Sequence, residues 1–221
     1  MDKLSEQDRA FVERAGHHRL HARGSAIVSQ GQASGPALIV EEGWLKSAHV
    51  SAHGAQALLG IIGPGAVVGA LQILTDTPHT GEVTALTDSQ VLHITKPRFL
   101  QLLAERPAVE HAVHRSLFSR ARDAEGHLAS ICSLPPEQRL CRLILCLVQG
   151  YGERTGSGLE ICIPLSQLDF AAWAGVSIET VQRILRTWRR RGIISTGRQR
   201  ITVLDATSLS RITCVNGRAS R

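Results

Sequence analysis

Residues 165–194 read LSQLDFAAWAGVSIETVQRILRTWRRRGII, a stretch that predicts two short helices joined by a tight turn. The first helix is predicted over residues 166–173 and the turn over residues 174–176. Ser177 is a suitable N-cap for the second helix, which continues to about Arg190. In a helix-turn-helix, the second helix enters the major groove of DNA. The stretch therefore predicts a DNA-binding helix-turn-helix, and the alternative is an ordinary pair of surface helices in an all-α domain.

Helical spacing separates an apolar face of this segment from a polar one. The side chains predicted to fill the space between the two helices are Phe170, Val176, Val181 and Ile184. The side chains predicted to point outward from the second helix are Ile178, Glu179, Gln182, Arg183 and Arg186. The outward face is the one that would contact DNA.

The basic residues are concentrated in the C-terminal part of the chain. Residues 1–134 contain 12 Lys and Arg against 13 Asp and Glu, whereas residues 135–221 contain 13 against 6. The net charge of +6 therefore arises entirely after residue 134. Arginines can neutralise phosphates and release their counterions, so this distribution indicates double-stranded DNA as the partner. The arginines in and just after the second helix are Arg186, Arg189, Arg190, Arg191, Arg198 and Arg200.

Composition narrows the class of protein further. A chain of 221 residues that is 43% apolar can form one large or two modest domains. No apolar stretch approaches 18 residues and the first residues predict a charged amphipathic helix, so we expect a cytoplasmic protein without membrane association. The cysteines form no CxxC pair and are expected to be buried, reduced thiols, with Cys141 and Cys146 in a helix core. They are Cys132, Cys141, Cys146, Cys162 and Cys214.

Short apolar runs separated by glycine and proline turn signals occupy much of the first 95 residues. The runs are residues 26–29, 37–40, 44–50, 56–62, 66–69, 82–86 and 90–94. Many short strands at this spacing are typical of an antiparallel barrel or a sandwich such as a jelly roll. We expect a compact β-domain over residues 1–106.

A long helix is predicted to begin near Pro107 and to end at Ser133, before Pro135. It carries small and apolar side chains at spacings of three and four, a pattern typical of a helix that pairs with its copy in a symmetric dimer. The alternative is that this stripe packs only on the β-domain of its own chain. The stripe consists of His114, Leu117, Ala121, Ala124, Leu128 and Ile131. We assign residues 107–134 to dimerisation and residues 135–221 to DNA binding.

The order of these parts resembles the Crp/Fnr family of transcription regulators. The most specific portion is SIETVQRIL at residues 177–185, and supporting positions are Gly31, Glu42-Gly43, Pro64-Gly65 and Gly69. The resemblance implies an α+β fold with an N-terminal antiparallel β jelly-roll sensing domain, a long dimerisation helix and a C-terminal winged helix-turn-helix. Residues 192–203 match the wing hairpin, with its turn at Thr196-Gly197. The resemblance also implies a homodimer on an inverted-repeat operator, allosteric control through the barrel, and RNA polymerase as a partner.

The same resemblance assigns base-reading residues. Glu179 would accept a hydrogen bond from a cytosine amino group, and Arg183 would donate two to guanine O6 and N7. Ile178 stands where the branch that responds to cyclic AMP has an arginine, which places this chain nearer the Fnr-like branch. Gln182 is then the candidate for the base that differs, through adenine or a thymine methyl. The positions that would touch phosphates are Ser166, Gln167, Ser177, Thr180, Arg186, Arg190, Arg198 and Arg200.

The effector pocket departs from the family's pattern. Relatives that bind a cyclic nucleotide hold the ribose with a Gly-Glu pair and the phosphate with Arg-Ser or Arg-Thr. The corresponding residues are Gly69-Ala70 and His79-Thr80, a change that argues against cyclic AMP although His79 and Thr80 could still contact an anion. No cysteine precedes Cys132, so an N-terminal iron–sulfur cluster is not expected. The effector is unknown.

The ten histidines leave some alternatives open. Haem could bind through His79 or another barrel histidine. No metal site is expected, because the pair His111 and His114 and the N-terminal group His17, His18 and His21 have no further ligand at convincing spacing. Other functions that remain open are a small-molecule-binding module that contacts protein, and a ligand-independent regulator controlled by its abundance. No arrangement of catalytic residues indicates an enzyme.

Overall fold

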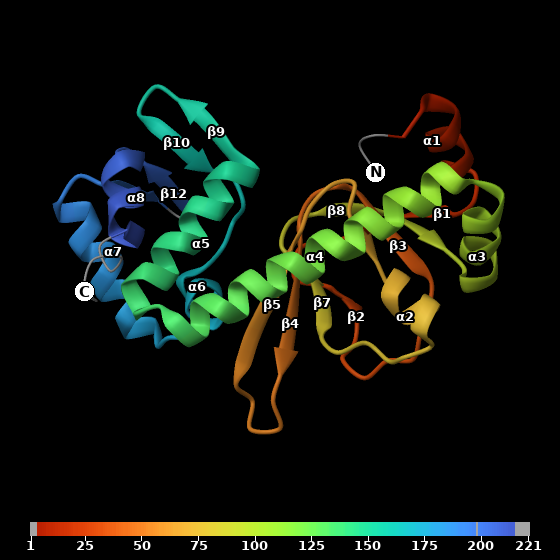
Figure 1. The fold of residues 1–221 in the computed structure, drawn as a ribbon, viewed down its shortest axis with the longest axis horizontal. Helices are drawn as coiled ribbons and strands as arrows, with labels where there is room; N and C mark the ends of the chain where they lie inside the picture. The colour runs from red at the N-terminus through yellow and green to blue at the C-terminus, as the bar shows by residue number, and fades with distance from the viewer. Residues whose placement is uncertain (1–3, 198, 215–221) are drawn as a thin grey trace, which may run out of the picture. The chain divides into compact units, whose positions relative to one another are not determined.

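The computed structural model describes residues 4–197 and 199–214, and the chain divides into two compact units between Gly126 and His127. Figure 1 labels most of the elements of each unit. This division falls within the long helix, whereas the predicted functional division places residues 1–106, 107–134 and 135–221 in three parts. The three-part division stays a prediction about function.

The first unit is built on two antiparallel sheets. Their strand orders are β1-β8-β3-β6 and β2-β7-β4-β5. The jelly-roll prediction is confirmed, and each predicted apolar run contains a strand. The strands are β1 (His17–His21), β2 (Ala26–Val28), β3 (Ala37–Glu42), β4 (Leu45–Val50), β5 (Gln56–Ile62), β6 (Val67–Val68), β7 (Glu82–Ala85) and β8 (Ser89–Ile94).

Strand β3 shows why some runs are continuously apolar. Its side chains alternate between two cores: Leu38 and Val40 lie in the core shared with Val83 of the second sheet, whereas Ala37 and Ile39 lie in a core lined by helices. Both faces of the strand are therefore buried, and no polar residue interrupts the run.

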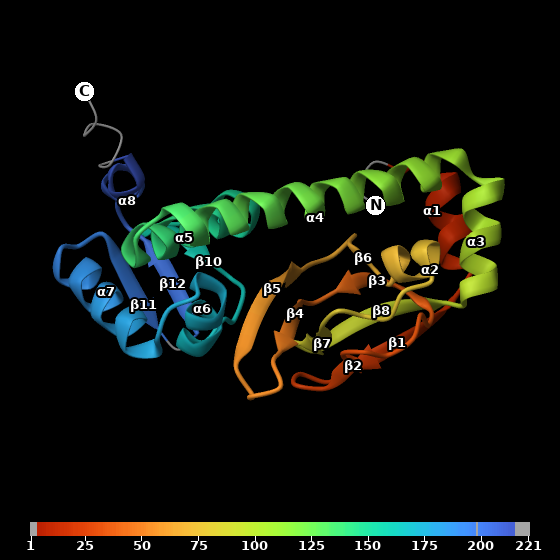
Figure 2. The same cartoon turned by 60° about the horizontal axis from the view of Figure 1, so that its bottom comes forward.

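Helices cover the outer face of the β3-containing sheet. They are α1 (Glu6–Glu13), α2 (Ala70–Thr75), α3 (Lys96–Glu105) and the first turns of α4 (Pro107–Ser133). Phe99 of α3 and Val113 of α4 are wholly buried in the same core as Val12 of α1. Figure 2 shows α1 and α3 beside the start of α4, as this shared core requires.

Three elements of this unit were not predicted. Strand β1 reads HHRLH, and its exposed side chains give no apolar alternation. Helix α2 is only six residues long, and α3 begins at Lys96-Pro97 directly after a strand. For α3 a sequence signal was present, because proline in the first turn is typical of a helix start. The predicted long helix is confirmed at both ends, Pro107 and Ser133.

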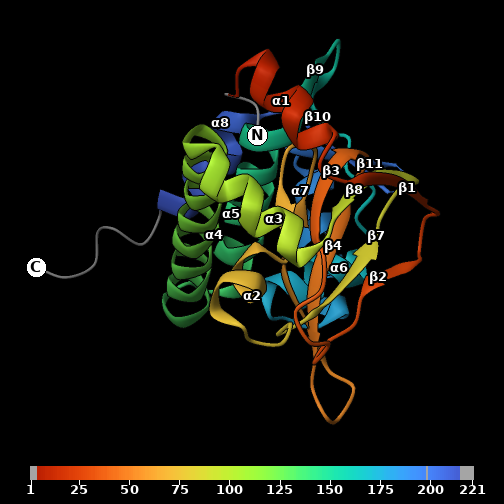
Figure 3. The same ribbon diagram turned by 90° about the vertical axis from the view of Figure 1, so that its right-hand side faces the viewer.

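The second unit combines helices with one small sheet of order β11-β12-β10-β9. Figure 3 shows α5, α7 and the hairpin β9–β10 from another side. The hairpin β9–β10 was not predicted. The elements are α5 (Pro136–Tyr151), β9 (Gly152–Thr155), β10 (Gly158–Ile161), α6 (Gln167–Ala174), α7 (Ile178–Arg190), β11 (Ile194–Gly197), β12 (Arg200–Val203) and α8 (Ala206–Cys214).

The wing hairpin is present, but its predicted turn was wrong. Gly197 pairs with Arg200, so Thr196 and Gly197 belong to strand β11 and the turn follows them. Gln199 adopts a left-handed conformation with φ of 58°, which allows the tight reversal. Arg198 lies outside the described residues.

The expectation of buried cysteines was largely wrong. Cys141 is buried and its thiol donates to the Leu209 carbonyl at 2.9 Å, whereas Cys132, Cys146 and Cys162 are exposed. Cys146 follows Cys141 by five residues, a rotation of about 140° around the helix, which takes it off the buried face of α5. The side chain of Cys214 lies outside what the structure describes.

Within the described residues, no helix is long and apolar enough to cross a membrane.

Candidate functional site

Helix α6 is fixed at both ends by local chemistry. The Ser166 hydroxyl accepts from the Asp169 N–H at 3.1 Å, and the Asp169 carboxylate accepts from the Ser166 N–H at 2.9 Å and from its hydroxyl at 2.6 Å. This reciprocal capping box stabilises the helix start. Gly175 ends the helix in a left-handed conformation, with φ of 61°. The predicted helix and turn are confirmed.

Helix α7 begins at its predicted cap and has two distinct faces. Ser177 accepts from the Thr180 N–H at 3.3 Å. One face is buried and consists of Val181, Ile184, Leu185 and Trp188. Phe170 of α6 is buried with it, whereas Val176, predicted to lie between the helices, is only half-buried. The predicted outward residues Glu179, Gln182, Arg183 and Arg186 are exposed, and Ile178 is half-buried.

The exposed face of α7 presents a carboxylate and a guanidinium one turn apart. A hydrogen bond from its own backbone N–H, followed by one from Ser177, lowers the pKa of Glu179, so this carboxylate is an ionised acceptor. Arg183 is exposed. Within the described part of the chain, no ion pair joins these two side chains, so each can pair with a base edge.

Some of the basic side chains around α7 are exposed, whereas others are bonded to neighbouring side chains. Arg186 and Arg190 are exposed, whereas Arg189 donates to the Thr196 hydroxyl at 3.3 Å. Arg200 forms an ion pair of 3.2 Å with Glu160 of β10. Among the other predicted phosphate contacts, Gln167 is exposed, and the hydroxyls of Ser166, Ser177 and Thr180 take part in the helix caps.

The structure brings the two halves of the predicted effector pocket together. Gly69 has φ of 84°, and a Cβ there would lie 2.9 Å from the Pro36 carbonyl oxygen and 3.9 Å from Cε1 of His79. Only glycine fits this close approach without strain. Ala70 is buried and begins α2, whereas Thr80 is exposed, and its carbonyl accepts from Nδ1 of His49 at 2.8 Å.

His79, predicted to stand where relatives that bind a cyclic nucleotide have an arginine, is a buried side chain. Its side chain is only 6% exposed, and burial lowers the pKa of its imidazole. Its backbone is fixed by two bonds: it donates to the Gln32 carbonyl, and its own carbonyl accepts from Gly31 at 2.8 Å. Burial therefore favours the neutral form of this ring.

The predicted stripe on α4 is only partly used by its own chain. Leu117 is half-buried against the core of the first unit, whereas Ala121, Ala124, Leu128 and Ile131 are exposed. Phe118 is 73% exposed next to this stripe and was missed by the sequence analysis. Packing on its own β-domain therefore accounts for the start of the stripe but not for the rest.

A histidine contact in the first unit links residues far apart in sequence. Nε2 of His21 and Nε2 of His93 lie 3.0 Å apart, and the ring of His17 stacks on His93 with centroids 5.5 Å apart. His18 instead bonds Glu41 at 2.7 Å. Among the described residues, no group of three or more histidine, cysteine or acidic side chains could hold a metal ion.

Two family comparisons cover most of the chain. Residues 18–106 match the cyclic nucleotide-binding domain, and residues 138–212 match the Crp-like helix-turn-helix domain. The chain belongs to the Crp/Fnr family of transcription regulators. As a member of this family it is a DNA-binding transcription regulator and not an enzyme, and regulators of this family act as dimers.

Individual relatives have low sequence identity to this chain, but the similarity covers most of both proteins. The CRP-like cAMP-activated global transcriptional regulator of Mycobacterium tuberculosis is 26% identical over 86% of this chain and 84% of that protein. The cyclic AMP receptor protein of Thermus thermophilus is 27% identical over 88% and 87%. The solved structure of the c-di-GMP responsive global regulator CLP from Xanthomonas campestris has a TM-score of 0.78, with 17% identity over 90% and 99%.

Proposed function

We propose that this Crp/Fnr regulator binds an inverted-repeat operator as a homodimer and that the exposed face of α7 reads its bases. The observation that carries this proposal is the ionised Glu179 and the exposed Arg183, which lie one turn apart on α7. Ser177 caps the start of α7, and both ends of the preceding helix α6 are capped. Glutamate accepts from a cytosine amino group and arginine pairs with guanine O6 and N7, so a G·C pair suits this face. Gln182 and the half-buried Ile178 border it and would set the neighbouring base preference.

Phosphate contacts would surround this base-reading face. Arg186 and Arg190 are exposed and could contact the phosphates of the DNA backbone. The starts of α6 and α7, where free N–H groups favour anions, hold Ser166, Gln167, Ser177 and Thr180. To contact a phosphate, Arg200 would have to share its guanidinium between the phosphate and Glu160, or break its ion pair with Glu160. Arg198 completes the proposed set from outside the described residues.

The exposed stripe on α4 would join two copies of the chain. Ala121, Ala124, Leu128 and Ile131 are exposed on one helix, and Phe118 adds a large apolar side chain to them. A parallel pairing would bring two recognition helices to the separation of successive major grooves, roughly 34 Å. The resulting homodimer would act on DNA in the cytoplasm together with RNA polymerase.

Control would pass through a proposed effector site formed by Gly69, Ala70, His79 and Thr80. Two relatives are cyclic AMP regulators by name, but this chain has a buried alanine and a neutral histidine where a ribose acceptor and a phosphate-binding cation are needed. We therefore propose an effector other than cyclic AMP. It would bind one arrangement of the dimer more tightly than the other.

Selection of bound sequences from a random duplex pool tests the proposal. The expected result is an inverted repeat with half-site centres about one DNA turn apart and a G·C pair at a fixed position in each half. Repeating the selection with cell extract, and with cyclic AMP alone, tests effector control. Failure to enrich any sequence with either addition would contradict direct, sequence-specific binding by this chain.

A further inference from the structure

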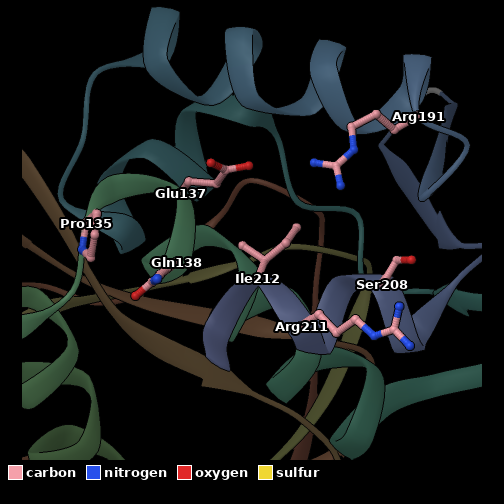
Figure 4. Close-up of a pocket in the computed structure, with 7 residues that line it drawn as sticks. All are labelled: Pro135, Glu137, Gln138, Arg191, Ser208, Arg211 and Ile212. Carbon is pink, nitrogen blue, oxygen red and sulfur yellow. The ribbon is translucent and has the colours of Figure 1, made fainter. Parts of the chain in front are cut away.

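A pocket of about 370 Å³ lies within the second unit, where the start of α5 and the end of α7 meet α8. Its volume is within the range of about 300–1,000 Å³ that is usual for small-molecule sites. Figure 4 shows the side chains that line it. None of them belongs to the proposed base-reading face or to the cassette of Gly69 and His79.

One wall of the pocket offers hydrogen-bond acceptors. Glu137 accepts from Nε1 of Trp188 at 2.8 Å through one carboxylate oxygen, which leaves the second oxygen for a ligand. Gln138 also lines the pocket, but its Oε1 is buried, and Figure 4 shows its amide turned away from Glu137 and Arg191. A carboxylate oxygen is a strong acceptor for a charged donor, so this wall suits a ligand that carries a cationic hydrogen-bond donor.

The opposite wall offers positive charge. Figure 4 shows the guanidinium of Arg191 and the carboxylate of Glu137 facing each other across the pocket. No ion pair of 4.0 Å or less joins them in the described part of the chain, so the two charges stand apart with the pocket between them. A guanidinium binds a carboxylate through two parallel hydrogen bonds. Arg211 of α8 adds a second guanidinium to the lining.

We propose that this pocket binds a small zwitterion, namely an α-amino acid with a short aliphatic side chain. Its ammonium group donates to Glu137, its carboxylate accepts from Arg191, and its side chain contacts Ile212. The pocket has guanidinium donors on one wall and the Glu137 carboxylate on the other, so a simple anion would pair with the guanidinium groups but not with Glu137.

Such a ligand would contact the recognition helix at two places. Trp188, wholly buried in α7, is bonded to Glu137, and Arg191 is the residue that follows the last turn of α7. Occupancy of the pocket would therefore change the environment of Trp188 and the order at the end of α7. Tryptophan fluorescence is a direct reporter of binding.

Titration of the full-length protein with L-valine tests the proposal, without DNA, by calorimetry and by tryptophan fluorescence. N-acetyl-L-valine lacks the ammonium and L-valinamide lacks the carboxylate, and we expect each to bind at least about tenfold more weakly than L-valine, a difference of 1.4 kcal/mol or more. The proposal is wrong if L-valine does not bind at millimolar concentration. It is also wrong if N-acetyl-L-valine or inorganic phosphate binds as tightly, because the pocket is then an anion site.

Matched variants locate the binding. Arg191→Gln removes the carboxylate partner, and Glu137→Gln removes the negative charge while keeping an oxygen that can accept from Trp188. Each is expected to weaken L-valine binding about tenfold or more. Arg189→Gln is the control, because Arg189 donates to Thr196 and does not line the pocket. Retained binding in Arg191→Gln, or an equal loss in Arg189→Gln, would overturn the assignment. Circular dichroism establishes that each variant is folded.

Discussion

Single side chains of α7 are either packed in the core or exposed to solvent, according to the face of the helix on which they lie. Trp188 is wholly buried and bonded to Glu137, whereas Arg183, five residues earlier, is exposed. Periodicity predicted that Val181 and Ile184 are buried and that Arg183 is exposed, because a helix turns about 100° per residue, but Trp188 was not among the predicted core residues. Periodicity did not predict the contact with Glu137, since that residue lies 51 positions away on another helix.

Arg183→Ala should lower specific DNA affinity by roughly 1–3 kcal/mol and relax preference at one base pair, because a bidentate contact to guanine is lost. Competition binding with the selected operator and with a random duplex measures both effects. Arg190→Ala is the matched control and should weaken both duplexes alike. Equal losses on the two duplexes for Arg183→Ala would remove its base-reading role.

His93 makes the stability of the first unit depend on pH. Burial, followed by the charges of His21, Arg19 and His17, lowers the pKa of His93 to about 4. The unfolded chain therefore binds a proton more readily than the folded one between about pH 6.5 and pH 4. The free energy of unfolding should fall through this window as pH falls, by up to about 3 kcal/mol, and the loss should be absent above it.

Urea denaturation at pH 7, 5.5 and 4.5 measures this dependence. His93→Gln removes the titrating group, so its free energy of unfolding should change less across the window than that of the wild type. Carboxylates titrate in both proteins, and their contribution cancels in the comparison. Identical pH profiles for the two proteins would show that His93 does not carry the effect.

At the scale of elements, short-range signals determined where the helices of the second unit begin and end. Ser166, Gly175 and Ser177 were identified as boundaries because caps and turns require particular side chains or φ values. Strand β1 carries no such signal, whereas the hairpin β9–β10 carries one that the sequence analysis missed, the two-residue turn Gly156-Ser157 between the paired Thr155 and Gly158. Strand β1 exists because β8 provides its hydrogen-bond partners, from His17 opposite His93 to His21 opposite Ser89.

Asp169→Ala should destabilise the second unit by about 1–2 kcal/mol, because the half of the capping box that serves the Ser166 N–H is lost. Thermal and urea denaturation measure the change. Glu125→Ala, which removes an exposed acid from α4, is the control and should stay within about 0.5 kcal/mol of the wild type. A change of that small size for Asp169→Ala would mean that the capping box contributes little to stability.

At the scale of the whole molecule, the two units carry different parts of a regulator. The first unit matches a cyclic nucleotide-binding domain, and the second matches a helix-turn-helix domain and holds all of the net positive charge. The sequence could not decide whether the stripe on α4 served its own chain or a second one. The structure shows Leu117 packed on the first unit and Leu128 61% exposed.

Leu128→Glu should weaken dimerisation by at least about tenfold in the dissociation constant, because a charge would enter an apolar seam. Sedimentation velocity over a range of concentrations measures this. Ala129→Glu introduces the same charge at the next exposed position, about 100° around the helix, and should have little effect. An unchanged dimer in Leu128→Glu would place the dimer interface elsewhere.

The sequence by itself determined the helix-turn-helix, the long helix, the β-domain and which face of α7 is exposed, because caps and periodicity act over a few neighbouring residues. Only the tertiary structure decided which cysteines are buried, where the wing turns, that His79 approaches Gly69, and that Glu137, Gln138 and Arg191 share a pocket. These features depend on contacts between residues far apart in the chain, and local spacing carries no information about such contacts.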